Sequence, residues 1–578
     1  MLIDYSVAFV LSTVSKSFLR FSRKLAPLGL RQWNVWTVGV VGIAGLIATP
    51  VFVVFSSIFT NQRNAWEHLA AYVLQQYITN SLLLMLGVSG GVLGIGVGTA
   101  WLVTMCAFPG RRIFEWALLL PLAAPAYLLA YTYTDVLDYF GPIQTTLRDI
   151  FGWQSATDYW FPNSRSLGGA IAMLTLVLYP YVYLLTRVTF LEQALCTQEA
   201  SRSLGCNPWQ SFFKVALPLA RPAITAGLSL ALMETLNDFG TVEYFGVPTF
   251  TTGIYRTWIG SGERVAATQL AAVLMMFILS LILLEHWSRR QARYYQTSSP
   301  FQQLAAYSLQ GGRAFLAWWS CFSPIALGLL IPGGLLLSMT ITHAAETLNQ
   351  RFWSLALNSL ALAFLTGGLA ILLSLFLVYG LRLCGTPVMR FGVQIAAMGY
   401  AIPGSVIAVG ILIPLAQGEG AIAPLLQNWF HLPPGSVLQG TITALIFAYL
   451  VRFLAVSLST LESGLTKIRP SFDDTAHSLG HSARSTLIKV HAPLMGGSLL
   501  TALMLVFVDV MKELPATIVI QPSNFDTLAV RVYRYASDER LVEASAPALA
   551  IVLVGLLPVI FLSWQIAQSR LRSTVQPR

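Results

Sequence analysis

The sequence is short of charged side chains, which make up only 10% of its 578 residues, against roughly 25% in an ordinary soluble protein. Hydrophobic residues make up 55%. Apolar runs of about 20 residues, each long enough to cross a ~30 Å hydrocarbon layer, recur along the chain. These runs exclude the series of soluble domains that the length alone suggests, and they predict an all-α polytopic membrane protein. Basic loops on one membrane face explain the net charge of +10, so membrane lipid and not nucleic acid is the expected partner.

Two further absences limit the chemistry of the chain. No Gly-Lys pair occurs anywhere in it, which excludes a phosphate-binding loop of the form G-x4-G-K-[ST]. The five cysteines have neither the spacing of metal ligands nor that of a disulfide framework. We therefore expect no enzyme activity here, and we expect ATP and Mg, if they are used, to bind to a partner chain.

About twelve segments qualify as membrane-spanning helices. They are 36–58, 81–105, 113–133, 167–187, 222–240 and 268–287, then 321–341, 357–381, 391–415, 440–460, 495–512 and 545–566. Lys and Arg are concentrated in alternate short loops, and such loops stay in the cytoplasm. This pattern predicts a multi-pass protein of the bacterial inner membrane with both termini in the cytoplasm.

The chain repeats itself. Residues 199–218 read EASRSLGCNPWQSFFKVALP, and residues 474–493 read DTAHSLGHSARSTLIKVHAP. In both segments an acid precedes a glycine by six positions and a proline follows that glycine by thirteen, at a constant offset of 275 residues. Pro125 recurs as Pro403 at an offset of 278. Since each half holds six helices, an even number, the halves share one orientation and form a parallel tandem repeat, unlike inverted-repeat transporters.

Each repeated loop is predicted to form two short helices with a turn between them. Gly205 and Gly480 suit a helix C-terminus with positive φ, and Pro218 and Pro493 are predicted to mark the break before the next apolar helix. Small residues after the acid leave room for another surface to approach. We expect a docking role for ten residues: Glu199, Ala200, Ser201, Gly205 and Pro218 in the first loop, and Asp474, Thr475, Ala476, Gly480 and Pro493 in the second.

This pattern resembles the EAA loop, E-A-A-x3-G-x9-I-x-L-P, of the membrane subunits of binding-protein-dependent ABC importers. The resemblance implies that each loop is a coupling helix that seats in a groove on an ATPase subunit. The second copy departs from the motif at Asp474, Thr475 and Ala492, which implies weaker or asymmetric docking. We call residues 199–218 and 474–493 the first and second coupling loops.

Four acids are predicted within the membrane, where carboxylates are expensive and usually face a partner or a water-filled path. Glu234 and Asp238 are four residues apart, which places them on one face of the predicted fifth helix. The offset of 275 carries them onto Asp509 and Glu513. Their oxygens suit a hard cation, but no metal site is assigned. Two interpretations stay open: the acids line the translocation path, or they lie at the membrane interface, cap helix ends, or pair with Lys512 and nearby arginines.

Over nearly all twelve helices, the chain resembles the fused two-module permease subunit of ferric-iron ABC importers. The residues that carry this resemblance are 108–144, 233–258 and 533–560. It implies alternating access, with Fe(III) as the transported substrate. It also implies two ATPase subunits and a periplasmic or lipid-anchored iron-binding protein as partners.

We expect five regions. These are a cytoplasmic lead-in (1–35), a first permease module (36–287), a cytoplasmic linker (288–320), a second permease module (321–566) and a cytoplasmic tail (567–578). The long outward loops 134–166, 241–267 and 517–544 mix charges and aromatic rings, which suits either a docking partner or solvent.

Other functions fit parts of this pattern. A fused permease for thiamine or a phosphonate would share both coupling loops and all twelve helices, although the paired carboxylates argue against an anionic phosphonate. A proton- or ion-coupled secondary transporter would also carry membrane acids, but it has no need for two coupling loops.

Overall fold

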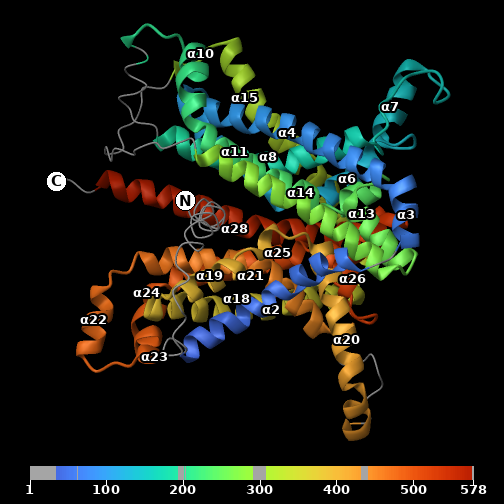
Figure 1. Ribbon diagram of the computed structural model, residues 1–578. Coiled ribbons are helices and arrows are strands. Elements are labelled where there is room, and N and C mark those ends of the chain that lie inside the picture. The colour runs from blue at the N-terminus through green and yellow to red at the C-terminus, as the bar shows by residue number, and fades with distance from the viewer. Residues whose placement is uncertain are drawn as a thin grey trace. The chain divides into compact units, whose positions relative to one another are not determined.

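The structure is a computed structural model, and it describes residues 34–60, 63–192, 201, 203–290, 307–430 and 440–575 (Figure 1). Within these residues, nine helices are long and apolar enough to cross a membrane, or twelve if each of three sharply bent helix pairs is one span. This confirms the expectation of an all-α polytopic membrane protein. Residues 1–33 of the lead-in, residues 291–306 of the linker and the last three residues lie outside the described ranges.

The elements of the first half begin at Val35. They are α2 (Val35–Ser56), η2 (Ser57–Phe59), α3 (Arg63–Tyr72), α4 (Leu74–Met105), β1 (Cys106–Ala107), α5 (Arg111–Ala117), η3 (Leu120–Ala123), α6 (Ala126–Leu137), α7 (Pro142–Phe151), α8 (Leu167–Glu192), α10 (Pro208–Ser211), η4 (Phe212–Ala216), α11 (Leu217–Asn237), α12 (Gly240–Tyr244), α13 (Phe250–Tyr255), η5 (Arg256–Gly260) and α14 (Arg264–Arg290).

The second half continues from Tyr307. Its elements are β2 (Tyr307–Ser308), α15 (Gly312–Ile325), η6 (Ala326–Leu330), α16 (Ile331–Thr342), α17 (Ala344–Thr347), α18 (Gln350–Cys384), α19 (Pro387–Ala396), η7 (Gly399–Ala401), α20 (Gly404–Phe430), α21 (Ile442–Thr466), α22 (Ser471–Ser478), α23 (Ala483–Thr486), η8 (Leu487–His491), α24 (Ala492–Leu494), α25 (Gly496–Lys512), α26 (Pro515–Ile520), α27 (Leu528–Ser537) and α28 (Leu541–Val575).

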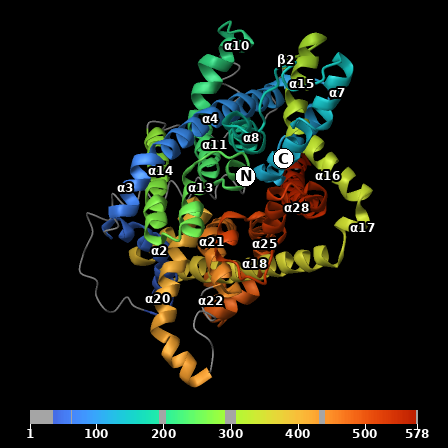
Figure 2. The same ribbon diagram turned by 90° about the vertical axis from the view of Figure 1, so that its right-hand side faces the viewer.

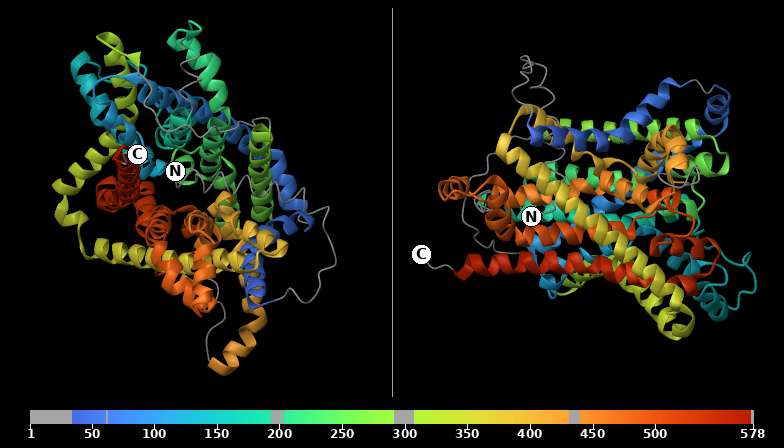
Figure 3. Two further views of the ribbon diagram at one scale, coloured as in Figure 1. Left: turned by 90° about the vertical axis from the view of Figure 1, so that its left-hand side faces the viewer. Right: turned by 90° about the horizontal axis from the view of Figure 1, so that it is seen from below.

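The helices form two compact units. Unit 1 holds the described residues of 1–69, 253–278 and 350–531, and unit 2 holds those of 70–252, 279–349 and 532–578. In unit 1, α18, α21 and α25 pack against one another, and α20 extends beyond the other helices (Figures 2 and 3). In unit 2, α4, α8 and α11 form the central packing, and β1 pairs in parallel with β2.

Each unit contains helices from both halves of the sequence. In unit 1, α2 from the first half packs against α19 and α20 from the second half. The approach is close, because a Cβ atom built on Gly410 of α20 would lie 2.6 Å from the backbone oxygen of Pro50 in α2. In unit 2, α28 from the second half packs against η3 and α6. Each compact unit therefore combines helices from both predicted modules, and the module boundaries stay a prediction about the sequence repeat.

The predicted third and ninth spanning helices, 113–133 and 391–415, are each broken. The chain bends by 88° before α6 and by 118° before α20. The bends fall at the repeated prolines, where Ala124 and Ile402, the residues before them, have extended ψ values of 122° and 125°. Proline supplies no backbone N–H and pushes the preceding residue out of the α region. Treating Pro125 and Pro403 as positions inside continuous helices was therefore wrong.

Candidate functional site: the coupling loops and the membrane acids

The second coupling loop forms the two short helices that the sequence predicts, α22 and α23. The first of them ends in a tight turn at Gly480, whose φ is 79°. The backbone N–H of His481 donates to the oxygen of Ala476 (3.0 Å), and that of Gly480 donates to the oxygen of His477 (2.9 Å). This pair of bonds is the Schellman motif, in which glycine adopts the left-handed conformation at little cost.

The first coupling loop makes the same turn. Gly205 also has φ 79°, and the N–H of Cys206 donates to the oxygen of Ser201 at 3.1 Å. Ser201 is buried, and its hydroxyl donates to Ser211 Oγ at 3.3 Å. The expected positive φ at both glycines is thus confirmed. Glu199 and Ala200 lie outside the described residues.

Both loops begin their second short helix with a side-chain cap. The Asn207 carboxamide accepts from the backbone N–H of Gln210 at 2.8 Å, and the Ser482 hydroxyl accepts from the N–H of Ser485 at 3.3 Å. Asn207 and Ser482 are 275 positions apart. Asn and Ser are favoured at this position because they satisfy an N–H that the helix cannot.

A π-helical turn precedes the proline in each loop, but the chain then continues differently. Pro218 lies in the first turn of α11, and the helix runs without a break from Pro208 to Asn237. Pro218 directly follows the π-helical turn η4, where the regular i→i−4 hydrogen bonding is already interrupted. After Pro493, by contrast, the chain bends by 78° near Met495. The predicted break is therefore wrong for Pro218, and for Pro493 it falls two residues later.

The second coupling loop is anchored by a polar cluster, which we call the clamp: Tyr379, Arg382, Asp473 and His491. The Arg382 Nε donates to Asp473 Oδ2 at 2.9 Å, and Nη1 and Nη2 donate to the backbone oxygens of Leu465 and Ile468. His491, which is fully buried, lies 2.6 Å from Asp473 Oδ1 through its Nε2 atom.

The clamp also contacts α23, the second short helix, and it favours the ionised form of Asp473. The Tyr379 hydroxyl donates to the backbone oxygen of Ala483 at 2.7 Å. Partial burial opposes ionisation of Asp473, but the hydrogen bonds from Arg382 and His491 outweigh it and hold its pKa below the usual value. The clamp therefore ties α22 to the end of α18 through the ionised carboxylate of Asp473, and it ties α23 there through the Tyr379 hydroxyl.

Within the described residues, the first coupling loop is supported by aromatic rings. At the offset of 278, Trp101 corresponds to Tyr379 and Thr104 to Arg382. The Trp101 ring packs edge-on against Phe212 of η4, with centroids 4.9 Å apart, and against Phe190 of α8 at 5.7 Å. Among the described residues, the two loops thus share a turn, and the residues at the clamp positions of α18 are replaced in α4 by Trp101 and Thr104.

Sequence reasoning missed four exposed apolar residues on the loops. Leu204 is 83% exposed and Leu479 is 74% exposed, each directly before the turn glycine, and Phe213 and Ile488 are also exposed. Both pairs are 275 positions apart. Applying the offset of 275 to apolar positions as well as to the motif would have found these four residues. They give both loops a similar apolar surface.

The expectation that Glu234 and Asp238 share a helical face is wrong, because α11 ends at Asn237 and Asp238 has an extended ψ of 133°. The Asp238 carboxylate instead accepts from the Thr241 hydroxyl (2.9 Å) and from the backbone N–H groups of Thr241 and Val242 (both 3.1 Å). It therefore caps the start of α12, a role that Asp fills readily. Glu234 is half-buried and makes no ion pair within the described residues.

The corresponding acids of unit 1 have cationic partners. Asp509 lies 2.9 Å from Lys512. Glu513, one residue beyond the end of α25, forms a buried ion pair with Arg452 at 3.2 Å and accepts from the N–H of Ala516 at 3.0 Å. Capping and pairing therefore describe Asp238, Asp509 and Glu513, while a place for the four acids on a path stays a prediction.

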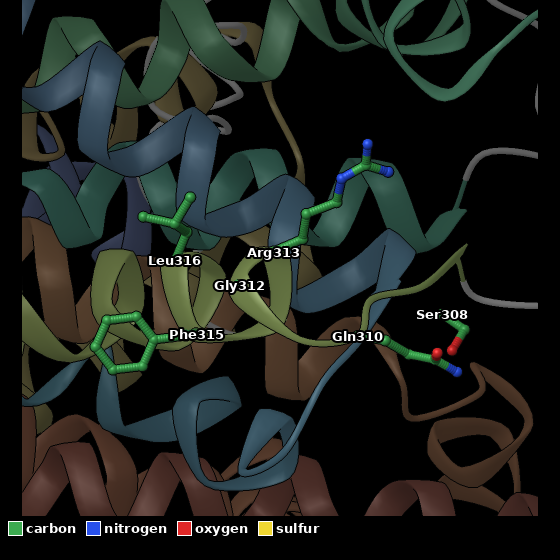
Figure 4. Close-up of a pocket in the computed structure, with 6 residues that line it drawn as sticks. All are labelled: Ser308, Gln310, Gly312, Arg313, Phe315 and Leu316. Carbon is green, nitrogen blue, oxygen red and sulfur yellow. The ribbon is translucent and has the colours of Figure 1, made fainter.

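In the part of the chain that the structure describes, the acids form no metal site with other side chains. Within the described residues, no group of three or more His, Cys, Asp or Glu could hold a metal ion. A pocket of about 800 Å³ in unit 2 lies at the start of α15 and contains none of the four acids. Figure 4 shows Gln310 and Arg313 on one side of this pocket and Phe315 and Leu316 on the other.

Comparison with known proteins identifies the architecture. Residues 90–285 and 385–571 each match the family described as the binding-protein-dependent transport system inner membrane component. Together these matches cover more than half of the chain. The chain belongs to this family. It is thus a non-catalytic permease component of an ABC transporter in the inner membrane, with an ATPase and a binding protein as partners.

Several relatives share one or both modules. The Fe(3+)-transport system permease protein FbpB 2 of Haemophilus influenzae is 25% identical over 85% of this chain and 90% of its own length. The ferric transport system permease protein FbpB of Actinobacillus pleuropneumoniae is 22% identical over 91% of this chain and 77% of its own. The molybdenum transport system permease protein ModB of Escherichia coli is 27% identical over 35% of this chain and 87% of its own.

Proposed function

We propose that this permease receives Fe(III) from an extracytoplasmic binding protein and passes it to the cytoplasm. ATP hydrolysis, with its Mg, takes place on two separate ATPase subunits. The observation that carries the choice of substrate is the match over the full two-module length. Two relatives that match at least 85% of this chain, over 77% or more of their own length, are both named for ferric transport.

The two coupling loops are proposed to dock the two ATPase subunits. Identical φ values at Gly205 and Gly480 and exposed leucines before both glycines would present a similar surface to two copies of one partner. A single permease chain would then supply both docking sites. Both loops and both termini are proposed to lie in the cytoplasm.

Transport is proposed to proceed by alternating access. Closure of the ATPase subunits on ATP moves the coupling loops, and the loops pass this motion to the helices that they adjoin. For the second loop the clamp provides a rigid connection to α18, and for the first loop α10, η4 and α11 form one continuous helix. The chain itself makes and breaks no covalent bond.

We also propose that Glu234 faces the path. It is the acid among the four that has neither a cationic partner nor a capping role within the described residues, so its carboxylate is the one available to a passing cation. Asp238, Asp509 and Glu513 are proposed to line the same path, with hydrogen bonds and ion pairs that hold them in place.

Uptake of radioactive iron tests the choice of substrate. Cells that lack the endogenous ferric importer would receive this chain with its ATPase and binding protein, and accumulation of radioactive iron, thiamine, molybdate and 2-aminoethylphosphonate would be compared. We expect accumulation of iron alone, and its loss when the ATPase carries an inactive ATP site. ATP-dependent accumulation of another solute without iron would keep the ABC permease and overturn the iron assignment.

A further inference from the structure

The segment between α6 and α8 holds a helix whose exposed face is apolar. Ile143 and Ile150 of α7 are exposed, and their spacing of seven residues places them on one side of the helix. Phe151, the last residue of the helix, is exposed as well. Phe140, before the helix, is 90% exposed, and Trp160, after it, is 86% exposed. A helix on a water-facing surface normally shows the opposite pattern, with its apolar side inward.

The inward side of α7 is polar and well ordered. The Gln144 side chain, which is buried, donates to the oxygen of Leu137 (2.7 Å) and accepts from the Tyr159 hydroxyl. Arg148 donates to the oxygen of Tyr139 (2.8 Å) and to the Tyr159 hydroxyl (3.1 Å), and its guanidinium lies 4.0 Å from the centre of the Tyr139 ring. These bonds fix how α7 is rotated, so exposure of the apolar side is built into the segment.

The chain around α7 is also stiffened. The Asp158 carboxylate accepts from the backbone N–H groups of Gln154 and Ser155, both at 2.8 Å. The rings of Trp153 and Tyr159 stack with centroids 4.7 Å apart. The apolar side chains therefore project from a rigid element, and a rigid element can bind a surface without a large loss of conformational entropy.

We propose that α7, with Phe140 and Trp160, lies in the membrane interface and binds the lipid of the outer leaflet. The flanking helices define this location, because α6 ends at Leu137 and the membrane-spanning α8 begins at Leu167. The chain thus leaves and re-enters the membrane at one surface, and α7 begins five residues after α6 ends. Figure 1 shows α7 across the direction of α4, α8 and α11, at the end of unit 2 opposite α10.

The chemistry of the exposed side favours lipid over a protein partner. Trp is enriched at membrane interfaces, and an amphipathic helix in the interface buries an apolar side that carries residues such as Trp and Phe at the boundary between head groups and acyl chains. A binding protein that docks transiently is better matched by complementary charges, yet the apolar side of α7 has none. The assignment to the outer leaflet rests on the proposed function, because that function sets the orientation of the permease in the membrane. The contact with lipid does not depend on it.

Spin labels at single cysteines test this inference in the full chain. The native cysteines would be replaced, and Ile143, Ile150 or Asp149 would be changed to Cys in protein held in lipid nanodiscs. Successive positions lie about 100° apart around a helix, so Asp149, which is exposed, samples the side turned away from the apolar stripe. Collision with oxygen, which dissolves in lipid, would be compared with collision with a water-soluble nickel chelate.

We expect the labels at Ile143 and Ile150 to collide mainly with oxygen, and the label at Asp149 to collide mainly with the nickel chelate. Equal access of the chelate to all three labels would overturn the inference. Protection of Ile143 and Ile150 only after the binding protein is added would reassign the surface to that protein. Because no ATP or iron is present, failure of this test is distinguishable from failure of the proposed function.

Discussion

The ionised carboxylate of Asp473 is predicted to hold the second coupling loop in place. Asp473→Asn keeps the size of the side chain but removes its charge and one of its two acceptor oxygens. Arg382 and His491 both donate to this carboxylate, and a hydrogen bond to a charged group contributes about 1.5–3 kcal/mol. The Arg382 and Asp473 side chains are only 17% and 22% exposed, so the pair should exceed the ~0.2–1 kcal/mol of a fully exposed one.

We expect the substitution to lower the free energy of local opening of α22 by about 1–2 kcal/mol. Such a change speeds hydrogen exchange of the amides of residues 471–478 by roughly 5- to 30-fold. Hydrogen exchange with mass spectrometry, on the permease without its ATPase, measures this directly. Local opening is the suitable quantity because global unfolding of a large membrane protein is not a single equilibrium.

Asp474→Asn is the matched control for this experiment. It makes the same chemical change at the next residue, which is exposed and forms no ion pair within the described residues. We expect exchange in α22 to stay within about twofold of the unchanged protein. Equal exchange rates in the Asp473 and Asp474 variants would refute the clamp as the anchor of this loop.

Three further predictions concern docking, the path and pH. Leu204→Asp and Leu479→Asp should each weaken ATPase binding by about tenfold or more (~1.4 kcal/mol), measured by titration in detergent. Glu234→Gln should lower iron uptake while Glu263→Gln, an exposed neutralisation, leaves it unchanged in the same vesicles. Since the pKa of Asp473 is below its usual value, its stabilisation is present above the unfolded pKa and is lost as pH falls through the folded pKa. At pH 5–8, amide hydrogen exchange in α22 should therefore be faster in Asp473→Asn than in the unchanged protein. In stronger acid this difference should vanish.

Features set by local backbone chemistry could be predicted from the sequence. The twelve apolar runs, the duplicated loops and the positive φ at Gly205 and Gly480 follow from hydrophobicity, spacing and the absence of a Cβ atom. The breaks before α6 and α20 were also within reach, because proline restricts the residue before it. Pro125 and Pro403 were recognised as a repeat but not as the ends of helices.

Features set by tertiary contacts could not be predicted. Packing of α2 against α20 depends on pairs such as Pro50 and Gly410, and the sequence does not say which half of the chain supplies the partner. The clamp brings together Arg382 and Asp473, which are 91 positions apart, and nothing in the motif marks either of them. Asp238 was assigned to a helical face from spacing alone, and a helix end at Asn237 removed that relation.

The measurement that tests the central claim most directly is coupling in proteoliposomes. The permease and its ATPase would be reconstituted together, and ATP hydrolysis and iron accumulation would be followed with iron-loaded and iron-free binding protein. We expect stimulation and uptake with the loaded form only. Both should be lost in Gly205→Val and Gly480→Val, because a non-glycine residue in the left-handed conformation costs roughly 1–2 kcal/mol and distorts the docking turn. Full coupling in both variants, or a permease that binds no ATPase, would contradict the account.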